Sequence, residues 1–239
     1  MFAISTEKTV GELVVEVPGR SRVFEEMKID YCCGGSKTLS DACARRGVDV
    51  DVVLAKLDAM DAAGEVADVA DYGEMPLNEL VDHIVDTHHV YLRSELPRLE
   101  AMSKKVASVH GEKDERLVEL NANVSALVAE LTAHMMKEEQ ILFPVICQLA
   151  TTNTLPKMPF GTLANPIRAM EEEHDSAGNG LETAHRLTDG YVVPEKACNT
   201  HRALLDGLKD LELDLHQHIH KENNILFPRA LELEMQRRG

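Results

Sequence analysis

The sequence has no tryptophan, few other aromatic residues and no excess of basic residues. Aromatic residues make up 4% of the 239 residues, whereas 44% of the chain is hydrophobic. Leu, Val, Ala and Met must therefore fill the core, which suits helices better than sheets. The formal net charge is −16, so the basic footprint of a nucleic-acid-binding protein is missing. We expect an all-α protein that does not bind nucleic acid.

Long apolar runs are also missing. No stretch approaches the roughly 18 apolar residues of a membrane-spanning helix. The N-terminal sequence has neither the basic flank nor the apolar core of a signal peptide. Five cysteines, an odd number, fit reduced thiols better than a disulfide framework. The sequence predicts a cytoplasmic protein without a membrane span.

Three segments follow one another along the chain. Residues 1–60 contain short amphipathic stretches and a Cys-Cys-Gly-Gly turn, which predict a small helical domain. Residues 61–76 are acidic, small and punctuated by Gly and Pro, which is typical of a linker. Residues 77–239 hold four long helical patterns with short to moderate connections, which predict a four-helix bundle. The expected long helices cover residues 77–108, 115–150, 163–188 and 195–236.

The second and fourth of these helices repeat one motif. His134 and Glu138 precede an Ile-Leu-Phe-Pro sequence, and His218 and Glu222 do the same 84 residues later (218 − 134). The stripe expected to face inward in the second helix consists of Leu127, Leu131, His134, Glu138, Ile141 and Val145. Residues four apart lie one above the other on a helix. A carboxylate and an imidazole in an apolar stripe are costly unless paired or bound to a metal. The repeat therefore predicts a metal centre inside the bundle.

The first and third helices offer one further histidine each at the same depth. His89 precedes His134 by 45 residues, and His174 precedes His218 by 44. The pattern is thus His…His-x-x-x-Glu, present twice with nearly equal spacing. A lone histidine in an apolar stripe is usually a satisfied core residue, but here six residues follow one rule. That agreement favours metal binding.

Three other histidines compete for these roles. His88 is the rival of His89, but its own stripe is more mixed and its spacing fits the repeat less well. His216 and His220 are rivals of His218, but neither has a glutamate four residues further on. We therefore prefer His89 and His218 as ligands.

The ligand types indicate which metal is bound. Four imidazoles and two carboxylates suit a pair of divalent first-row ions about 3.5–4 Å apart, with a glutamate as a bridge. A set without thiolate points to iron or manganese rather than structural zinc. The predicted ligands are His89, His134, Glu138, His174, His218 and Glu222.

Four motifs carry a resemblance to known proteins. They are Asp30-Tyr-Cys-Cys-Gly-Gly35, His134-Met-Met-Lys-Glu-Glu139, Glu173-His174-Asp175 and Glu222-Asn-Asn-Ile-Leu-Phe-Pro228. The bundle resembles hemerythrin-like domains. The whole chain resembles the di-iron family of iron–sulphur cluster repair proteins, the YtfE/ScdA type of repair of iron centres.

This resemblance implies a cytoplasmic stress protein that restores iron–sulphur clusters damaged by nitric oxide or oxidants, through labile iron. It implies two non-haem iron ions with an oxo or hydroxo bridge and with Glu138 and Glu222 as carboxylate bridges. The implied partners are damaged iron–sulphur proteins, with nitric oxide or oxygen as small ligands. A homodimer through residues 1–60 is compatible with the sequence. Whether the protein is an enzyme stays open, because iron donation and redox chemistry on nitrogen oxides both fit.

The sequence departs from oxygen-carrying hemerythrins at one position. Those proteins carry a further histidine one turn after the ligand of the third helix, where this chain has Gly178. One imidazole fewer leaves an open coordination position, which argues against simple oxygen carriage. The alternative function is a nitric oxide or oxygen sensor or scavenger of the hemerythrin-like class. A ferritin-like oxidase is disfavoured because those bundles use Glu-x-x-His pairs and more carboxylates.

Cys32 and Cys33 are adjacent and are followed by two glycines. A disulfide between neighbours would be strained, since their Cα atoms lie closer together than in most disulfides. They form either a thiol pair that receives or passes iron, nitric oxide or electrons, or a turn whose thiols are incidental. The resemblance favours the thiol pair as the reactive group. The other three cysteines, Cys43, Cys147 and Cys198, are expected to pack structurally.

Overall fold

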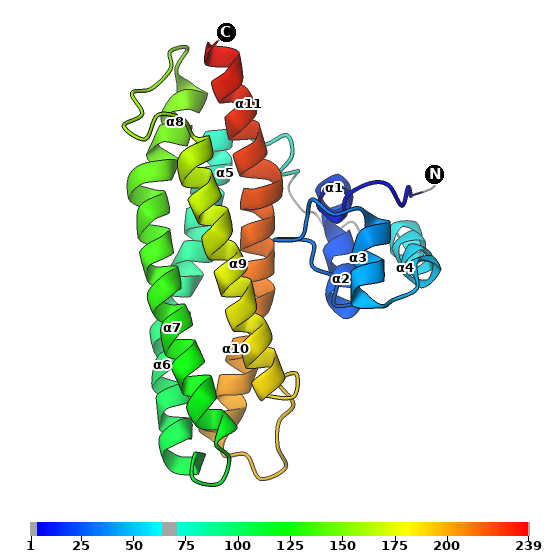
Figure 1. The fold of residues 1–239 in the computed structure, drawn as a ribbon, viewed down its shortest axis with the longest axis vertical. Coiled ribbons are helices and arrows are strands. Elements are labelled where there is room, and N and C mark those ends of the chain that lie inside the picture. The colour runs from blue at the N-terminus through cyan, green and yellow to red at the C-terminus, as the bar shows by residue number, and fades with distance from the viewer. Residues whose placement is uncertain (1–3, 64–70, 239) are drawn as a thin grey trace. The chain divides into compact units, whose positions relative to one another are not determined.

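The computed structural model describes residues 4–63 and 71–238 and is helical throughout (Figure 1). These residues contain no strand, only one isolated antiparallel bridge between Thr9 and Thr38. The predicted all-α fold class is therefore confirmed. Within the described residues, no helix combines the length and the apolar character needed to cross a membrane.

The N-terminal domain is built from four short helices, α1 (Val10–Glu16), α2 (Ser21–Glu26), α3 (Leu39–Arg46) and α4 (Val50–Ala63), with the 3₁₀ turn η1 (Pro18–Arg20) after α1. Thr9 and Glu12 form a capping box at the start of α1, and Thr38 caps α3. The domain has its own hydrophobic core, formed by Val10, Leu13, Val14, Val23, Phe24, Ile29, Tyr31, Leu39, Ala42, Cys43, Val53 and Leu57. Of the predicted linker, residues 61–76, only 64–70 lie outside the described residues, and residues 61–63 belong to α4.

Four long helical stretches follow, each close to its predicted range. The first runs through α5 (Leu77–Ile84), η2 (Val85–His89) and α6 (Val90–His110). The second comprises α7 (Arg116–Lys137), η3 (Glu138–Leu142) and α8 (Phe143–Thr151). The third is α9 (Ala164–Leu187). The fourth comprises α10 (Asn199–Lys221), η4 (Glu222–Leu226) and α11 (Phe227–Arg238).

The chain forms two compact units. One is Val81–Leu215, and the other combines Met1–Leu80 with His216–Gly239. Within Val81–Leu215, α7 packs on α6 and on α9. The Asn123 amide of α7 donates a 2.9 Å hydrogen bond to the Gly180 carbonyl of α9. Gly207 of α10 lies so close to α6 that a Cβ there would meet Leu99 at 2.8 Å. Within this unit these contacts join α6, α7, α9 and the part of α10 up to Leu215 into a bundle with a leucine-rich core.

Three of the four stretches contain one π-helical turn, namely η2, η3 and η4. Such a turn inserts one extra residue and rotates everything that follows around the helix axis. The predicted inward stripe of the second helix is wrong for this reason beyond Glu138. Ile141 is 48% exposed, and Leu142 and Ile146 are buried in its place.

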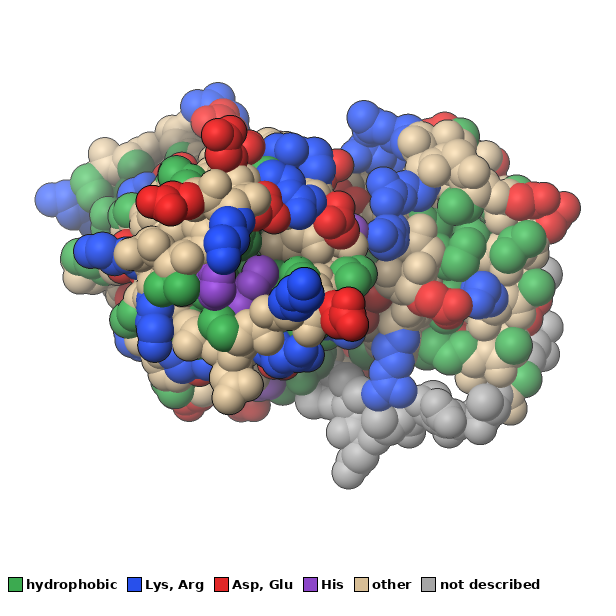
Figure 2. Space-filling view, turned by 90° about the horizontal axis from the view of Figure 1, so that it is seen from below, with side chains coloured by type: hydrophobic (Ala, Val, Ile, Leu, Met, Phe, Trp, Pro, Cys, Tyr) green, Lys and Arg blue, Asp and Glu red, His purple; other side chains and the backbone are tan. Residues whose placement is uncertain are grey.

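The surface carries charges of both signs despite the net charge of −16. Figure 2 shows one face on which Lys, Arg, Asp and Glu side chains are interspersed around a few visible histidine side chains. Arg116, for example, pairs with Asp114 at 2.8 Å and with Asp189 at 2.9 Å. Exposed pairs of this kind add little stability, because water screens them. The fold must therefore be held mainly by its apolar core.

Candidate metal centre

The predicted ligands lie where the helices change their hydrogen-bonding pattern. His89 is the last residue of η2, whereas Glu138 and Glu222 are the first residues of η3 and η4. Single π-helical turns occur frequently at functional sites, since the extra residue redirects side chains that an α-helix would place elsewhere. All three side chains are fully buried, with 0% relative exposure. The interruptions of the helices therefore coincide with the polar interior of the bundle.

The Glu138 carboxylate lies between two imidazoles in the Val81–Leu215 unit. Its Oε2 is 3.3 Å from Nε2 of His89, and its Oε1 is 3.3 Å from Nε2 of His134. The Nε2 atom of His174 lies 3.0 Å from Nε2 of His134. Two imidazole nitrogens this close, facing one carboxylate, form a ready set of donor atoms for a cation.

The fourth stretch repeats the arrangement of the second. Nε2 of His218 lies 3.1 Å from Oε1 of Glu222, and both side chains are buried. Because the two residues are four apart, both point to the same side of the helix. The two copies of the sequence repeat thus present the same His–Glu pair.

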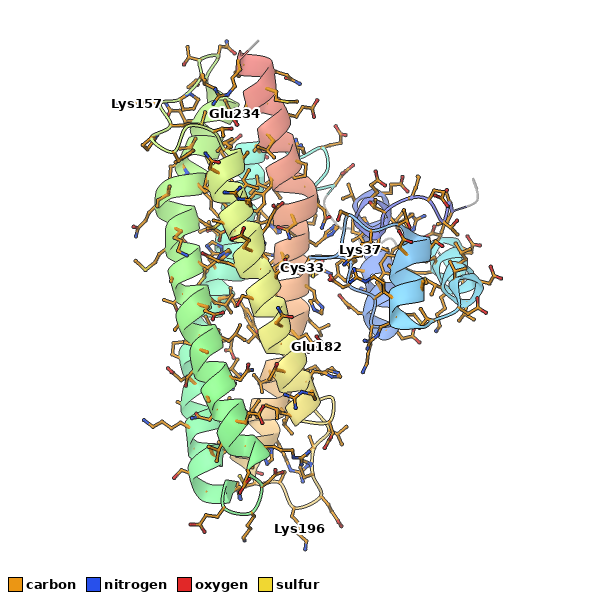
Figure 3. All side chains as sticks on the ribbon, viewed as in Figure 1. Cys33, Lys37, Lys157, Glu182, Lys196 and Glu234 are labelled. Carbon is orange, nitrogen blue, oxygen red and sulfur yellow. The ribbon has the colours of Figure 1, made fainter. Side chains whose placement is uncertain are left out.

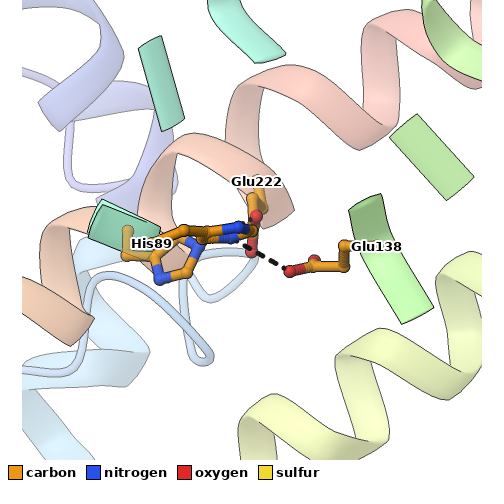
Figure 4. Close-up of side chains that lie close together, drawn as sticks. His89, Glu138 and Glu222 are labelled. Atoms are coloured by element: carbon orange, nitrogen blue, oxygen red, sulfur yellow. Dashed lines mark hydrogen bonds and ion pairs between the residues drawn. The ribbon is translucent and has the colours of Figure 1, made fainter. Parts of the chain in front are cut away.

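Two groups of buried side chains could each hold a metal ion, since the ligand atoms of each group lie within 4.8 Å of one another. The groups are His89, Glu138, His218 and Glu222, and His134, Glu138, His174 and Glu222. Glu138 and Glu222 belong to both groups, and Figure 4 shows the Glu138 carboxylate next to the His89 ring. Each of the six predicted ligands belongs to at least one of these two groups, and their binding of a metal stays a prediction.

The chemistry of this donor set fits a pair of cations. Two fully buried carboxylates surrounded by imidazoles would be costly to bury without positive charge nearby. Imidazole and carboxylate are ligands that first-row ions such as iron and manganese accept. Two neighbouring ions require ligand oxygen atoms that bind both of them, and the carboxylates common to both groups can supply these atoms.

Two further glutamates orient the histidines from outside. Oε1 of Glu139 lies 2.6 Å from Nδ1 of His89, and Oε2 of Glu173 lies 2.9 Å from Nδ1 of His134. A carboxylate at Nδ1 keeps the proton there, so that Nε2 carries the lone pair that can bind a metal. No sequence pattern indicates this role for either glutamate. Each stands next to a predicted ligand in the sequence, but contacts a ligand on another helix.

Basic residues hold these outer carboxylates in place. Glu139 accepts hydrogen bonds from Arg93, and Glu173 accepts one from Lys137. Partial burial opposes ionisation of both carboxyls, but the hydrogen bonds and positive charges around them lower the pKa of Glu139 and of Glu173 below the usual value. Both groups are therefore charged at neutral pH, as orientation of an imidazole requires.

We expect Glu173→Gln to lower the affinity of the second group for iron by about 10–100-fold, the usual effect of removing such an outer partner. His134 would lose the acceptor that fixes its ring. Competition with a chelator measures the affinity. Glu172→Gln, a change at the exposed neighbouring residue, is the matched control. Equal affinities in the two variants would show that Glu173 does not support metal binding through His134.

The rival histidines have other partners. Nδ1 of His88 lies 2.8 Å from Oδ1 of Asp214. The rings of His216 and His220 pack against Tyr31, with centroids 6.1 and 5.5 Å away. Burial lowers the pKa of His220 to about 4, so this ring is neutral at physiological pH. The choice of His89 and His218 over these rivals stays a prediction.

The predicted cysteine pair lies on the loop between α2 and α3. Cys32 is buried, and Cys33 is half-buried at the tip of the loop (Figure 3). A hydrogen bond with the Cys33 side chain, together with burial, raises the pKa of the Cys32 thiol well above its usual range. Cys32 is therefore a protonated thiol at neutral pH unless a ligand displaces the proton.

Asn224 attaches this loop to the helix that carries Glu222. Its amide donates to the Cys32 carbonyl at 3.2 Å and to Nδ1 of His220 at 3.2 Å. A Cβ on Gly35 would lie 2.1 Å from Oδ1 of Asn224, and one on Gly11 would lie 2.4 Å from the same atom. The loop and α1 can approach Asn224 this closely only because both positions are glycine.

Gly35→Ala should therefore lower the free energy of unfolding by about 1–3 kcal/mol, as overpacking does. Asn224→Ala in the same chain should remove the clash, so that the double variant loses less than the sum of the two single variants. Urea unfolding of the four proteins measures the coupling. Additive losses would show that the alanine is accommodated without touching Asn224.

The bundle and its centre are those of a hemerythrin-like cation-binding protein. Residues 80–230 match the family model of the hemerythrin HHE cation binding domain, and residues 6–61 match ScdA_N, a domain of unknown function (DUF542). The iron-sulfur cluster repair protein YtfE of Pectobacterium atrosepticum is 41% identical over 225 residues, which cover 94% of this chain and 97% of that protein. The YtfE of Yersinia pseudotuberculosis is 40% identical, with 94% and 96% covered. The chain belongs to the family of the iron-sulfur cluster repair protein YtfE.

Proposed function

We propose that this protein holds two non-haem iron ions in the bundle and uses them to repair iron–sulfur clusters damaged by nitrosative or oxidative stress. The observation that carries the proposal is that Glu138 and Glu222 belong to both groups of ligand atoms. Only a two-ion centre uses the same carboxylates twice. The names of the relatives supply the task, cluster repair.

Each side chain has a distinct part in this centre. We assign the imidazoles of His89, His134, His174 and His218 to the outer sides of the two ions. Glu138 and Glu222 would bridge the ions, and Glu139 and Glu173 would orient two of the rings. When bound, the iron pair supplies labile iron for the damaged cluster. Gly178, one turn after His174 on α9, provides no ligand, so the bound metal would have one protein ligand fewer there and could exchange a small ligand.

The thiol pair and the surroundings complete the proposal. Cys32 and Cys33 take part as thiols that pass iron, nitric oxide or electrons. A disulfide between these adjacent cysteines would be strained, which disfavours their pairing with each other. The cytoplasm is the compartment in which such thiols stay reduced. Damaged iron–sulfur proteins are the partners.

The proposal is tested by reviving an iron–sulfur enzyme whose cluster has been damaged with nitric oxide. The iron-loaded protein should restore several times more activity than the same amount of free ferrous iron. Metal-free protein is the control for a chaperone effect, and it should restore almost none. If free iron does as well as the loaded protein, iron donation is not its function.

A further inference from the structure

A second cluster of metal-ligating side chains lies on the loop between α2 and α3, outside the six residues of the centre. Ligand atoms of Asp30, Cys32 and Cys33 lie within 4.8 Å of one another. Asp30 is exposed, Cys32 is buried and Cys33 is half-buried. The cluster therefore has one side in the protein and one side open to solvent.

Hydrogen bonds fix the shape of this loop. Oδ1 of Asp30 accepts from the Cys32 backbone N–H at 3.0 Å, and Oδ2 accepts from the Gly34 N–H at 2.8 Å. The Cys32 thiol also donates to Oδ1 of Asp30, with 3.3 Å between sulfur and oxygen. The carboxylate thus stays beside the thiol, and its oxygens keep lone pairs for a further contact.

The donor set is suited to binding a metal ion. Two sulfur atoms and one carboxylate oxygen form a mixed set that ions such as Fe²⁺, Co²⁺, Zn²⁺ and Cd²⁺ accept. Neighbouring cysteines make a strained disulfide, so both sulfurs remain available as ligands. Three protein ligands leave a fourth position open, as in sites that exchange a ligand rather than in closed structural sites.

We propose that Asp30, Cys32 and Cys33 form a third metal site, which binds one divalent ion through two thiolates and one carboxylate. Binding replaces the two thiol protons by the ion and releases them to water, so no oxidant or reductant is needed. The identity of the physiological ion as iron in transit rests on the proposed function. The existence of the site does not.

The attachment of the loop fits a role in transfer. Asn224 holds the Cys32 carbonyl at 3.2 Å, and Asn224 stands two residues after Glu222 on the same helix. The Asp30 side of the cluster is open, so an ion can enter or leave there. A site with a fixed inner ligand and an exposed outer ligand suits delivery better than storage.

The test uses the full-length protein with its bundle centre already loaded with iron. Cd²⁺ is added, and the thiolate-to-metal charge-transfer absorption in the ultraviolet is followed. We expect a stoichiometry of one Cd²⁺ per chain. Cys32→Ser and Cys33→Ser should each abolish most of the absorption, and Asp30→Asn should weaken binding at least 10-fold. Cys198→Ser, which removes an exposed cysteine elsewhere, should change nothing.

The results of this titration decide whether Asp30, Cys32 and Cys33 form a metal site. Wild-type absorption that persists in Cys33→Ser would overturn the site, and so would one ion shared by two chains. Unchanged helical circular dichroism and unchanged iron in the bundle show that each variant is folded. If Cd²⁺ binds as expected but the iron-loaded protein revives no cluster enzyme, the proposed function fails and the third site stands.

Discussion

Glu138→Leu should remove iron from the protein without weakening the metal-free fold. Glu138 belongs to both groups of ligand atoms, so its loss affects both ions. Iron content should fall from about two per chain to less than one, since both ions would lose one of the two carboxylates proposed to bridge them. The metal-free variant should be at least as stable as the metal-free parent, because an apolar side chain replaces a fully buried carboxylate.

The expected loss of iron, together with unchanged or higher stability of the metal-free protein, distinguishes a metal ligand from a glutamate with a purely structural role. A glutamate that only accepts hydrogen bonds from His89 and His134 would, when removed, leave buried polar groups unsatisfied and lower stability. Iron analysis and thermal unfolding of both metal-free proteins measure the two effects. Glu182→Leu, which changes an exposed glutamate of α9 (Figure 3), is the control. A variant with normal iron content would show that Glu138 is not a bridge.

Removal of the metal from the unchanged protein should lower its unfolding temperature strongly. A ligand present at about 1,000 times its dissociation constant stabilises the folded state by about 4 kcal/mol. For a chain of 150–250 residues, each kcal/mol shifts the melting temperature by about 2–4 °C. Chelation should therefore lower the melting temperature by about 8–16 °C, and reloading with Fe²⁺ or Mn²⁺ should restore it.

Chelation should also show which part of the molecule depends on the metal for its stability. Hydrogen exchange should accelerate most around η2, η3 and η4, since buried carboxylates and imidazoles lose their counter-charge there. The hydrophobic core of the N-terminal domain contains none of the six ligands, so its amides should be affected least. An unfolding temperature that does not respond to chelation would mean that the six residues are satisfied without metal.

The sequence contains enough information for the fold and for a set of candidate ligands. The repeat at His134 and His218 is visible because two helices share one design. The π-helical turns cannot be predicted from the sequence, since no residue pattern indicates the extra residue in such a turn. The burial of Leu142 instead of Ile141 was therefore missed.

The outer carboxylates illustrate a second limit. Glu139 and Glu173 each bind a histidine on a different helix. Their role depends on how two helices are rotated against each other, which spacing along one helix does not specify. The same holds for Asn224, whose contact with the cysteine loop joins residues that are 192 positions apart.

Iron analysis of freshly purified protein, combined with Mössbauer spectroscopy, tests the two-ion centre most directly. We predict about two irons per chain, magnetically coupled through the shared carboxylates. In Glu222→Leu the coupling should disappear together with most of the iron. A single uncoupled iron per chain, bound equally well in the variant, would contradict the centre proposed for this bundle.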